Sequence, residues 1–591
     1  MRDINLRYLE EEYDDNGVLI KFETHVPEDY NFGYDVVDDI AENDPDRRAM
    51  VWANPEGEEH VFTFADMKRW SDKTANFLMG LGIGKGDRVL VILRRHYQFW
   101  FVATALAKIG AVIVPATFML KKHDMVYRLN EAQIKSIIAT DAGDVVEVVE
   151  EALPECPSVE SLILVNAGGG GLTPKDADGN PISADGQPIG AALSGEEGVC
   201  ALPGIREGWI DFNTGVREAS EDFPRQKTLA ADPMIMYFSS GTAGNPKMVL
   251  HDSLYSIGHL MTAKHWHNVR PDGIHFTIAD TGWGKAVWGK YYGQWLMEAC
   301  IFTYDFDRFD PSEILSLIGK YGITTLCMPP TMYRMIMQER LEDYDLSTLE
   351  YSTTAGEALN PDLFEFWKEH TGLTIFEGFG QTETPLTIGN LTNTTPRPGS
   401  MGKPVPLYDV AILREDGTEC DPGETGEICI SIDPHPAGIM IEYFRDEEKT
   451  NAAMHDGWYH TGDTAWADED GYYWYVGRND DVIKSSGYRI GPFEIESVLL
   501  EHDAVRECAV TGVPDELRGF AVKATIVLSD GFEPSEALTK ELQAWVKSQT
   551  APYKYPRIIE YVEELPRTVN GKIRRVAIRE ADADKQIDGL V

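Results

Sequence analysis

The chain has 591 residues, of which 43% are hydrophobic and 25% are charged. This length exceeds what one ordinary hydrophobic core supports and the composition is that of a soluble globular protein, so two or more domains are expected. The formal net charge of −44, from 53 Lys and Arg against 97 Asp and Glu, disfavours nucleic acid and anionic membranes as main partners.

The cysteines argue for a reducing compartment. The seven cysteines, at 156, 200, 300, 327, 420, 429 and 508, are scattered, and no two have C-x-x-C spacing. They are predicted to pack as small core residues, and the N-terminus has no apolar signal core. We therefore expect a cytoplasmic protein.

In the first 390 residues, short apolar strand candidates alternate with amphipathic helical patterns. Helices are predicted over 64–81 and 311–321. The strand candidates are 88–93, 136–140, 161–165, 301–304, 324–328 and 349–353. This alternation predicts a layered α/β architecture with mostly parallel sheets.

One apolar segment, from Phe99 to Leu120, is nearly long enough to cross a bilayer. It contains Lys108, Gly110 and Pro115. These residues favour a buried helix that ends near Gly110 and a short strand that Pro115 stops. No membrane span is expected.

The pattern changes after residue 166. Residues 166–225 contain a glycine run and two Asp-Gly pairs, which predict a surface excursion. From about 395 to 478, short alternating segments separated by turns predict a small β-barrel or sheet. A compact α+β unit follows, with helices expected near 492–502 and 534–548 and strands near 507–513, 521–528 and 558–562. We expect an N-terminal domain over 1–479, made of two α/β layered subdomains plus the small β-barrel, and a C-terminal domain over 480–591.

The most informative motif is Tyr237-Phe238-Ser239-Ser240-Gly241-Thr242-Ala243-Gly244-Asn245-Pro246-Lys247, a hydroxyl-rich loop of small residues that ends in a lysine. Its amides, hydroxyls and lysine can wrap a polyphosphate. Apolar residues precede the loop, and a helix is expected from His251, which gives a strand–loop–helix context. The loop is not the Walker pattern, because Pro246 precedes the lysine and Met248 follows it. A surface turn is the alternative.

Two further motifs carry oxygen ligands and acceptors. The run Gly378-Phe379-Gly380-Gln381-Thr382-Glu383-Thr384 follows an apolar strand. Its Thr382 can donate to a phosphate, and Glu383 is a hard ligand suited to Mg²⁺. In Thr461-Gly462-Asp463 the aspartate can accept hydrogen bonds from ribose hydroxyls. Taken singly, each motif is also explained as a polar turn.

The last motifs lie around the expected domain joint and near the C-terminus. Arg478 and Arg489 are planar donors suited to phosphate or ribose. Gly487 permits close approach of a ligand to the backbone. Lys572 follows Asn570-Gly571, and a lysine on a glycine turn is usually solvated unless the C-terminal domain folds over the active site.

Together and in this order, the motifs resemble the ANL adenylating enzymes, which include acyl-CoA synthetases, peptide-synthetase adenylation domains and luciferases. The resemblance covers residues 35–578, and the runs 380–384, 486–492 and 551–556 are most similar to the medium-chain acyl-CoA synthetase branch. It implies an AMP-forming ligase that uses ATP, Mg²⁺ and coenzyme A, and a C-terminal domain that is mobile.

The resemblance also implies a role for each matching residue. The phosphates of ATP would be held by Ser239, Ser240, Gly241, Thr242, Gly244 and Lys247. The adenine would be framed by Gly356, Glu357, Ala358, Gly378, Phe379 and Gly380, and Gln381 would also belong to the cofactor site. Thr382 would contact phosphate, Glu383 would bind Mg²⁺, and Asp463 and Arg478 would hold the ribose. Lys572 would reach the reacting carboxylate and the α-phosphate.

The remaining implied roles concern the hinge, coenzyme A and the acyl group. Asp480 would be the hinge between the domains. Coenzyme A would face Ser486, Gly487, Tyr488 and Arg518, with Arg489 near the nucleotide or acyl group and Ser548 and Tyr555 as weaker candidates. Acetate-using relatives carry tryptophan where this chain has Gly380, which implies a deeper pocket and an acid larger than acetate. Trp283, Lys285 and Trp288 are candidates for the pocket wall, although Trp288 is equally explained as core packing.

Two other functions fit part of the pattern. One is an adenylation enzyme that loads a carrier protein, but no carrier domain is expected between Lys572 and Val591. The other is a nucleotide sensor without catalysis, which the presence of all the expected charged residues disfavours. The expected partners are a small carboxylic acid, ATP and coenzyme A, and a homodimer is open.

Overall fold

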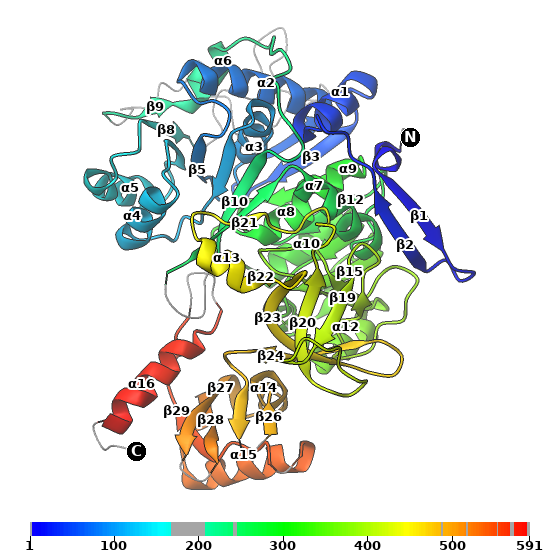
Figure 1. The fold of residues 1–591 in the computed structure, drawn as a ribbon, viewed down its shortest axis with the longest axis vertical. Coiled ribbons are helices and arrows are strands. Elements are labelled where there is room, and N and C mark those ends of the chain that lie inside the picture. Colours follow the sequence, from blue (N-terminus) through cyan, green and yellow to red (C-terminus); the bar gives the residue numbers. More distant parts are fainter. Residues whose placement is uncertain are drawn as a thin grey trace.

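The computed structural model describes residues 3–166, 207–239, 245–357, 359–485, 488–515, 518–551, 553–567 and 572–587. Figure 1 shows two large sheets and their helices in one body, with the elements that follow residue 480 gathered at one end. A hairpin of β1 (Leu9–Tyr13) and β2 (Leu19–Thr24) projects beside the N-terminus.

The first large sheet has eight strands in the order β21-β11-β10-β6-β5-β7-β8-β9. The neighbouring strands β6, β5, β7, β8 and β9 pair in parallel. At the other end of the sheet, β11 pairs antiparallel with both β10 and β21. The strands are β5 (Arg88–Ile92), β6 (Val112–Pro115), β7 (Ser136–Thr140), β8 (Ser161–Val165), β9 (Ile210–Asp211), β10 (Pro233–Ser239), β11 (Lys247–Asp252) and β21 (Glu442–Tyr443). The helices of this part are α1 (Asp39–Asn43), α2 (Phe64–Gly80), α3 (Gln98–Ile109), α4 (Lys122–Glu131), α5 (Val145–Ala152) and α6 (Phe212–Glu218).

The second large sheet has nine strands in the order β18-β17-β16-β15-β14-β12-β13-β3-β4, and its central strands are parallel. The strands are β3 (Arg48–Ala53), β4 (Glu59–Thr63), β12 (Ile274–Thr277), β13 (Cys300–Tyr304), β14 (Thr325–Cys327), β15 (Tyr351–Ala355), β16 (Ile375–Phe379), β17 (Ile388–Gly389) and β18 (Lys403–Pro404). Its helices are α7 (Leu254–Leu260), α8 (Gly284–Lys290), α9 (Tyr292–Leu296), α10 (Pro311–Tyr321), α11 (Pro330–Ile336) and α12 (Pro361–Thr371). The α/β layers predicted from the alternation are therefore confirmed.

The helix over the apolar segment ends where its residues require. Gly110 caps α3 with φ = 80°, a backbone conformation that favours glycine. Lys108 is fully buried, and its Nζ lies 2.6 Å from Oδ1 of Asp38 and 2.6 Å from Oδ1 of Asp72. The pairing lets a lysine reside in the core. Among the described residues, no helix combines the length and the apolar character that a bilayer crossing requires.

A smaller sheet follows, with the order β19-β20-β23-β22 and β24 paired to β23. Its strands are β19 (Val410–Leu413), β20 (Gly426–Ser431), β22 (Met454–His455), β23 (Trp458–Ala467) and β24 (Tyr473–Arg478), and α13 (Glu447–Ala453) precedes β22. The β-rich region is thus present, and the pairings among its described strands form an open sheet rather than a closed barrel.

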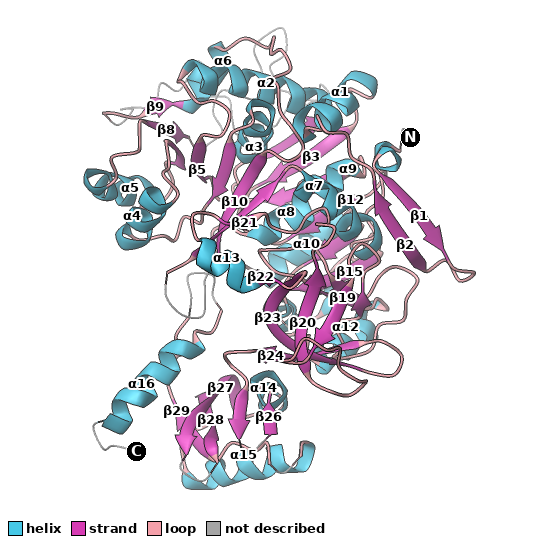
Figure 2. Cartoon of the chain, in the orientation of Figure 1, coloured by secondary structure: helices cyan, strands magenta, loops and turns pink. Residues whose placement is uncertain are grey.

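The last unit is a five-stranded sheet with helices, shown at the lower end of Figures 1 and 2. Its strands are β25 (Ile483–Ser485), β26 (Tyr488–Ile490), β27 (Val505–Asp515), β28 (Gly519–Leu528) and β29 (Ile558–Tyr561), and its helices are α14 (Pro492–Leu500), α15 (Glu536–Gln549) and α16 (Arg575–Ile587). Each strand and helix predicted after residue 480 is found, with ends that coincide or differ by at most two residues. This sheet and its helices enclose a separate cluster of buried apolar side chains.

Candidate active site

The predicted adenine-framing residues lie where two neighbouring parallel strands end. Ala355 at the end of β15 pairs with Gly378 in β16, so Gly356, Glu357 and the run 378–380 meet at the carboxyl edge of the sheet. Open α/β sheets bind ligands at this edge. Gly356 has φ = 96°, which favours glycine there. Lys285 Nζ donates a hydrogen bond to the Ala355 carbonyl oxygen at 2.6 Å, and Ala358 lies outside the described residues.

The predicted phosphate loop joins two antiparallel strands. Ser239 is the last residue of β10 and pairs directly with Lys247, the first residue of β11. The predicted helix is present, but its predicted start at His251 is wrong, because β11 continues to Asp252 and α7 begins only at Leu254. The consecutive apolar residues Met248, Val249 and Leu250 extend the strand before the helical pattern begins. A helix N-terminus therefore does not complete this loop, and Ser240, Gly241, Thr242 and Gly244 lie outside the described residues.

Lys247 and Glu383 are joined through Tyr443 of β21. The Tyr443 hydroxyl donates to Oε1 of Glu383 at 2.9 Å, and Lys247 Nζ lies 3.3 Å from the same hydroxyl oxygen. Lys247 Nζ also lies 4.6 Å from the centre of the Tyr443 ring. Thr382, which precedes Glu383, is held in place because its carbonyl oxygen accepts a hydrogen bond from His251 Nε2 at 2.8 Å.

The surroundings of Lys247 suit a polyanion. Burial lowers the pKa of Lys247, and the nearby Glu383 carboxylate opposes that effect. Glu383 is 8% exposed. A carboxylate that is held by a neutral hydroxyl donor and faces a lysine is the kind of hard oxygen ligand that Mg²⁺ takes beside phosphate oxygens. The residues present therefore fit a magnesium ion.

Asp463 is the centre of a second hydrogen-bonded group. It pairs across β23 and β24 with Arg478, whose Nη1 lies 3.4 Å from its Oδ2. The Gln381 amide donates to the same Oδ2, and the Tyr475 hydroxyl donates to Oδ1 at 3.0 Å. The Tyr459 hydroxyl donates to Gln381 Oε1 at 2.6 Å. The group links the loop after β16 to the β-rich sheet, so two distant motifs of the sequence meet.

The charge of Lys572 acts on this group. Burial raises the pKa of Asp463, and the positive charges of Arg478 and Lys572 oppose that rise. Burial lowers the pKa of Lys285, and the charge of Lys572 adds to that effect. Lys572 is itself exposed. A C-terminal cation therefore acts electrostatically on residues from β23 and α8.

Gly380 lies against Trp288 of α8. A Cβ atom at residue 380 would lie 2.4 Å from Cη2 of Trp288 and 2.3 Å from the carbonyl oxygen of Pro385. Trp288 is buried, whereas Trp283 and Lys285 are half-buried. The glycine therefore does not leave open space, because the indole of Trp288 fills it.

With this geometry in place, the family follows from comparison with known proteins. Residues 37–444 match the family model of the AMP-binding enzymes, and residues 494–572 match that of the AMP-binding enzyme C-terminal domain. The chain belongs to the AMP-binding enzyme family.

Similar proteins show to which class of AMP-binding enzyme the chain belongs. This AMP-binding enzyme is 40% identical over 564 residues to mitochondrial acyl-coenzyme A synthetase ACSM5 of Mus musculus. The alignment covers 94% of this chain and 91% of that protein. It is 38% identical over 567 residues to mitochondrial acyl-coenzyme A synthetase ACSM4 of Homo sapiens, again with 94% and 91% covered. The AMP-binding enzyme is accordingly an acyl-CoA synthetase, a ligase whose class uses ATP, Mg²⁺ and coenzyme A.

Solved structures of CoA ligases have the same fold as this chain. The anthranilate CoA ligase AuaEII in complex with anthranoyl-AMP superposes with a TM-score of 0.81 at 28% identity, covering 95% of this chain and 99% of that one. A benzoate CoA ligase from Burkholderia xenovorans LB400 gives a TM-score of 0.74 at 25% identity, covering 93% and 100%. These likenesses bear out the predicted fold class and support a CoA ligase rather than a carrier-loading enzyme.

The predicted cytoplasmic location is wrong. The similar mammalian synthetases are named mitochondrial. The prediction relied on cysteine usage, and the thiols of Cys156, Cys300, Cys327, Cys429 and Cys508 are indeed free. Free thiols indicate a reducing environment, and they do not distinguish one reducing compartment from another.

The hinge candidate of the AMP-binding enzyme lies beside an ion-pair network. Asp480 is exposed, and its Oδ1 lies 3.7 Å from Nε of Arg478. The next residue, Asp481, is buried and pairs with two arginines of α16, at 3.6 Å from Arg575 and 2.5 Å from Arg579. The sequence placed Asp481 at the expected joint but did not reveal these arginine partners, because they lie about a hundred residues away along the chain.

The coenzyme A candidates lie on the C-terminal sheet. The ring of Tyr488 stacks on that of Tyr553 with centroids 4.0 Å apart, and both rings are exposed. Arg518 pairs with Asp515 at 3.3 Å. The Ser548 hydroxyl donates to the Trp545 carbonyl oxygen, and the Tyr555 ring lies under Lys547 Nζ at 3.8 Å. Ser486, Gly487 and the side chain of Arg489 lie outside the described residues.

Sequence reasoning missed the tyrosines of the site. Tyr443, Tyr459 and Tyr475 donate to Glu383, Gln381 and Asp463 respectively. Burial raises the pKa of each of the three hydroxyls well above its ordinary value, so all three stay protonated donors. Nothing in the sequence marks them, because an aromatic residue in a strand is ordinarily a packing residue.

Proposed function

We propose that this synthetase converts a carboxylic acid larger than acetate into an acyl adenylate with release of pyrophosphate, and then transfers the acyl group to coenzyme A with release of AMP. The observation that carries the proposal is the convergence of two groups: Lys247 and Glu383 are joined through Tyr443, and Asp463 and Arg478 pair in the β-rich sheet, with the charge of Arg478 acting on both Lys247 and Glu383. The aromatic side chains near Gly380, Trp288 and Trp266, are of the apolar kind that suits a short- or medium-chain, branched or aromatic acid.

The residue types fit the first step. A carboxylate oxygen attacks the α-phosphorus of ATP, a new P–O bond forms, and the bond to the departing pyrophosphate breaks. Because both reactants are anions, cations placed where charge develops lower the barrier. Lys247 would face the phosphates and Lys572 the reacting carboxylate, while Asp463 and Arg478 would hold the ribose. A magnesium ion bound by Glu383 would supply further neutralisation of phosphate charge.

The second step needs different surroundings. The thiolate of coenzyme A attacks the acyl carbon, the C–S bond forms, and AMP departs with the electrons of the C–O bond. We propose that the chain divides into residues 1–479 and 480–591 and that Asp480 is the hinge, so that the C-terminal domain presents Lys572 in one step and the Tyr488 and Arg518 side in the other. The ion pairs of Asp481 with α16 support a joint at this point.

Trp288, Trp283, Lys285 and Gly380 are proposed to shape the acyl site. The contact of Gly380 with the Trp288 indole supports this assignment for these two residues. A homodimer is also proposed, and light scattering coupled to gel filtration tests it.

The decisive experiment is ATP–pyrophosphate exchange with a panel of carboxylic acids, with and without coenzyme A. A CoA ligase exchanges label with its preferred acid and makes AMP and acyl-CoA only when coenzyme A is added. Exchange without any thioester formation would contradict the second step, and a lack of exchange with every acid would contradict the first.

A further inference from the structure

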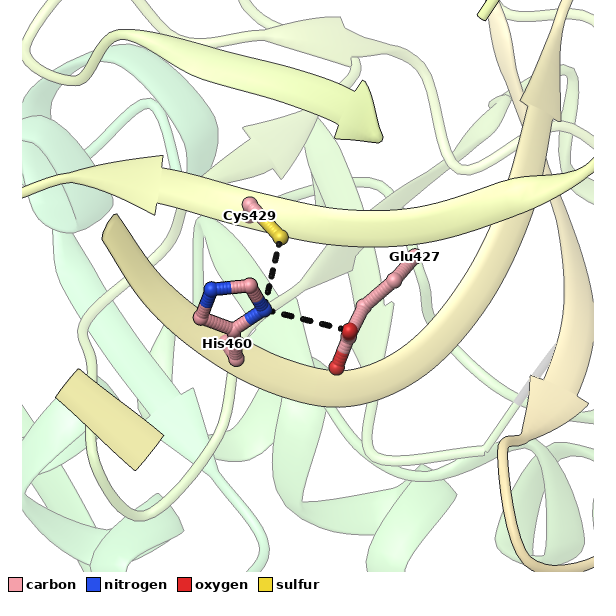
Figure 3. Close-up of side chains that lie close together, drawn as sticks. All are labelled: Glu427, Cys429 and His460. Atoms are coloured by element: carbon pink, nitrogen blue, oxygen red, sulfur yellow. Dashed lines mark hydrogen bonds and ion pairs between the residues drawn. The ribbon is translucent and has the colours of Figure 1, made fainter. Parts of the chain in front are cut away.

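A cluster of unlike metal-ligating side chains lies on the β-rich sheet. Glu427 and Cys429 are two residues apart in β20, and Cys429 pairs directly with His460 across the β20–β23 ladder. Residues two apart on a strand share a face. Figure 3 shows the three side chains pointing toward one another from the two strands.

Two of the three separations between the ligand atoms match those of a tetrahedral metal site. Cys429 Sγ lies 3.4 Å from His460 Nδ1, and Nδ1 lies 3.2 Å from Oε2 of Glu427. All three atoms lie within 4.8 Å of one another. Zinc bonds of about 2.3 Å to sulfur and about 2.0–2.2 Å to nitrogen and oxygen give tetrahedral edges of roughly 3.3–3.6 Å. The side chains therefore need only small movements to receive such an ion.

Neighbouring groups already orient the ligands. Oε1 of Glu427 accepts a hydrogen bond from the Gly462 backbone amide at 2.9 Å, which directs Oε2 toward His460. The ring of His455 stacks on that of His460 with centroids 4.0 Å apart. Outer partners of this kind fix the orientation of metal ligands.

The cluster is open on one side. Cys429 is fully buried, whereas the side chains of Glu427 and His460 are 25% and 20% exposed. A cation can therefore enter from solvent, with water completing its coordination. A site with three protein ligands and an open position is a common arrangement for zinc.

We propose that Glu427, Cys429 and His460 bind a thiophilic divalent cation of the Zn²⁺ class. The sulfur and imidazole ligands select against Mg²⁺, which prefers oxygen ligands, so this site is distinct from the one at Glu383. Through Glu427 and the Gly462 amide, the ion would also brace the strand that carries Asp463.

Cobalt titration of the full-length protein tests the proposal. Chelator-treated protein in excess Mg²⁺ is titrated with Co²⁺, and the thiolate-to-cobalt charge-transfer band is recorded. We expect one equivalent with a thiolate band that Zn²⁺ then abolishes. Cys429→Ser should lose the band, and His460→Gln should weaken binding by at least about tenfold, as loss of a ligand requires.

Matched controls separate this site from other thiols and clusters. Cys327 is another buried free cysteine, and Glu10, Glu23 and His25 form an exposed group on the hairpin. Cys327→Ser and His25→Gln should keep the band and the rise in Tm that Zn²⁺ produces. A band that survives Cys429→Ser, or the absence of any band in the wild type, would overturn the proposal. If Cys429→Ser does not fold, His460→Gln decides by the same two readouts.

Discussion

The carbonyl oxygen of Ala355 accepts a hydrogen bond of 2.6 Å from Lys285 Nζ, which ties α8 to the end of β15 at the proposed nucleotide site. The same helix carries Trp288, which contacts Gly380. One short helix therefore connects the strand edge that would frame the adenine to the residues that would shape the acyl site, so that changes in α8 are expected to alter acid preference.

The first prediction concerns Trp288. Replacing this indole by leucine vacates the space beside Gly380, so kcat/KM for bulky aromatic acids should rise about tenfold relative to short straight-chain acids. The cavity should lower the free energy of unfolding by about 3 kcal/mol. Pyrophosphate release over an acid panel measures the preference, and Trp466→Leu, which removes an indole stacked on Trp474, is the control. An unchanged preference would remove Trp288 from the acyl site.

The second prediction concerns Tyr443, which the sequence did not reveal. Tyr443→Phe removes the donor to Glu383 and the acceptor facing Lys247. A hydrogen bond to a charged group contributes about 1.5–3 kcal/mol, so kcat/KM for ATP should fall by about 10- to 100-fold. Tyr473→Phe, which loses only a bond to the Val410 carbonyl oxygen, should leave kcat/KM unchanged. Equal effects in the two variants would show that the Tyr443 hydroxyl has no special role.

The third prediction concerns pH and Glu377 in β16. Burial raises the pKa of Glu377 to about 8, although the Leu359 amide donates to it. The folded state therefore holds a proton that the unfolded chain releases, and the free energy of unfolding should fall as pH rises from about 4.5 to about 8. One proton corresponds to about 1.4 kcal/mol per pH unit. Denaturant unfolding at pH 6 and pH 8 should show this slope in the wild type and a smaller one in Glu377→Gln. The same slope in both proteins would rule out Glu377 as its source.

The fourth prediction concerns the buried lysine of α3. Lys108→Met leaves Asp38 and Asp72 without their closest cation. The expected loss of stability is about 3–5 kcal/mol. Lys68 pairs with the same carboxylates from a position 31% exposed, so Lys68→Met should cost only about 0–1 kcal/mol. Denaturant unfolding of the two variants measures the difference, and equal losses would contradict the assigned role of burial.

Sequence reasoning found the elements better than it found the contacts. The helix over 311–321 and the strands over 136–140 and 161–165 match α10, β7 and β8 at both ends. Their apolar periodicity is local information, which a single sequence contains. The helix expected from His251 begins only at Leu254, because residues 247–252 pair with β10 and the sequence does not encode this pairing locally.

In the candidate site, too, the residues with a local sequence signal were found, and those whose role depends on tertiary contacts were not. Asp463 and Arg478 were identified because each is a charged residue that follows a glycine in the sequence, although the structure places both in strands, β23 and β24. Tyr443 and Trp288 were missed or left open because buried aromatic residues are ordinary core residues until the fold shows what their polar or flat surfaces contact.

The central claim is that a lysine from the C-terminal unit neutralises the meeting of two anions. Lys572→Ala should lower the rate of adenylate formation by about 10²–10³-fold, because loss of one electrostatic donor costs about 2.7–4 kcal/mol. Arg574→Ala, which removes an exposed cation two residues away, should change that rate little.

The most direct measurement compares the two half-reactions of Lys572→Ala. Pyrophosphate release reports adenylate formation, and thioester synthesis from supplied acyl-AMP reports the second step. We predict a large loss in the first and near-normal rates in the second. Equal losses in both, or no loss in the first, would contradict the account.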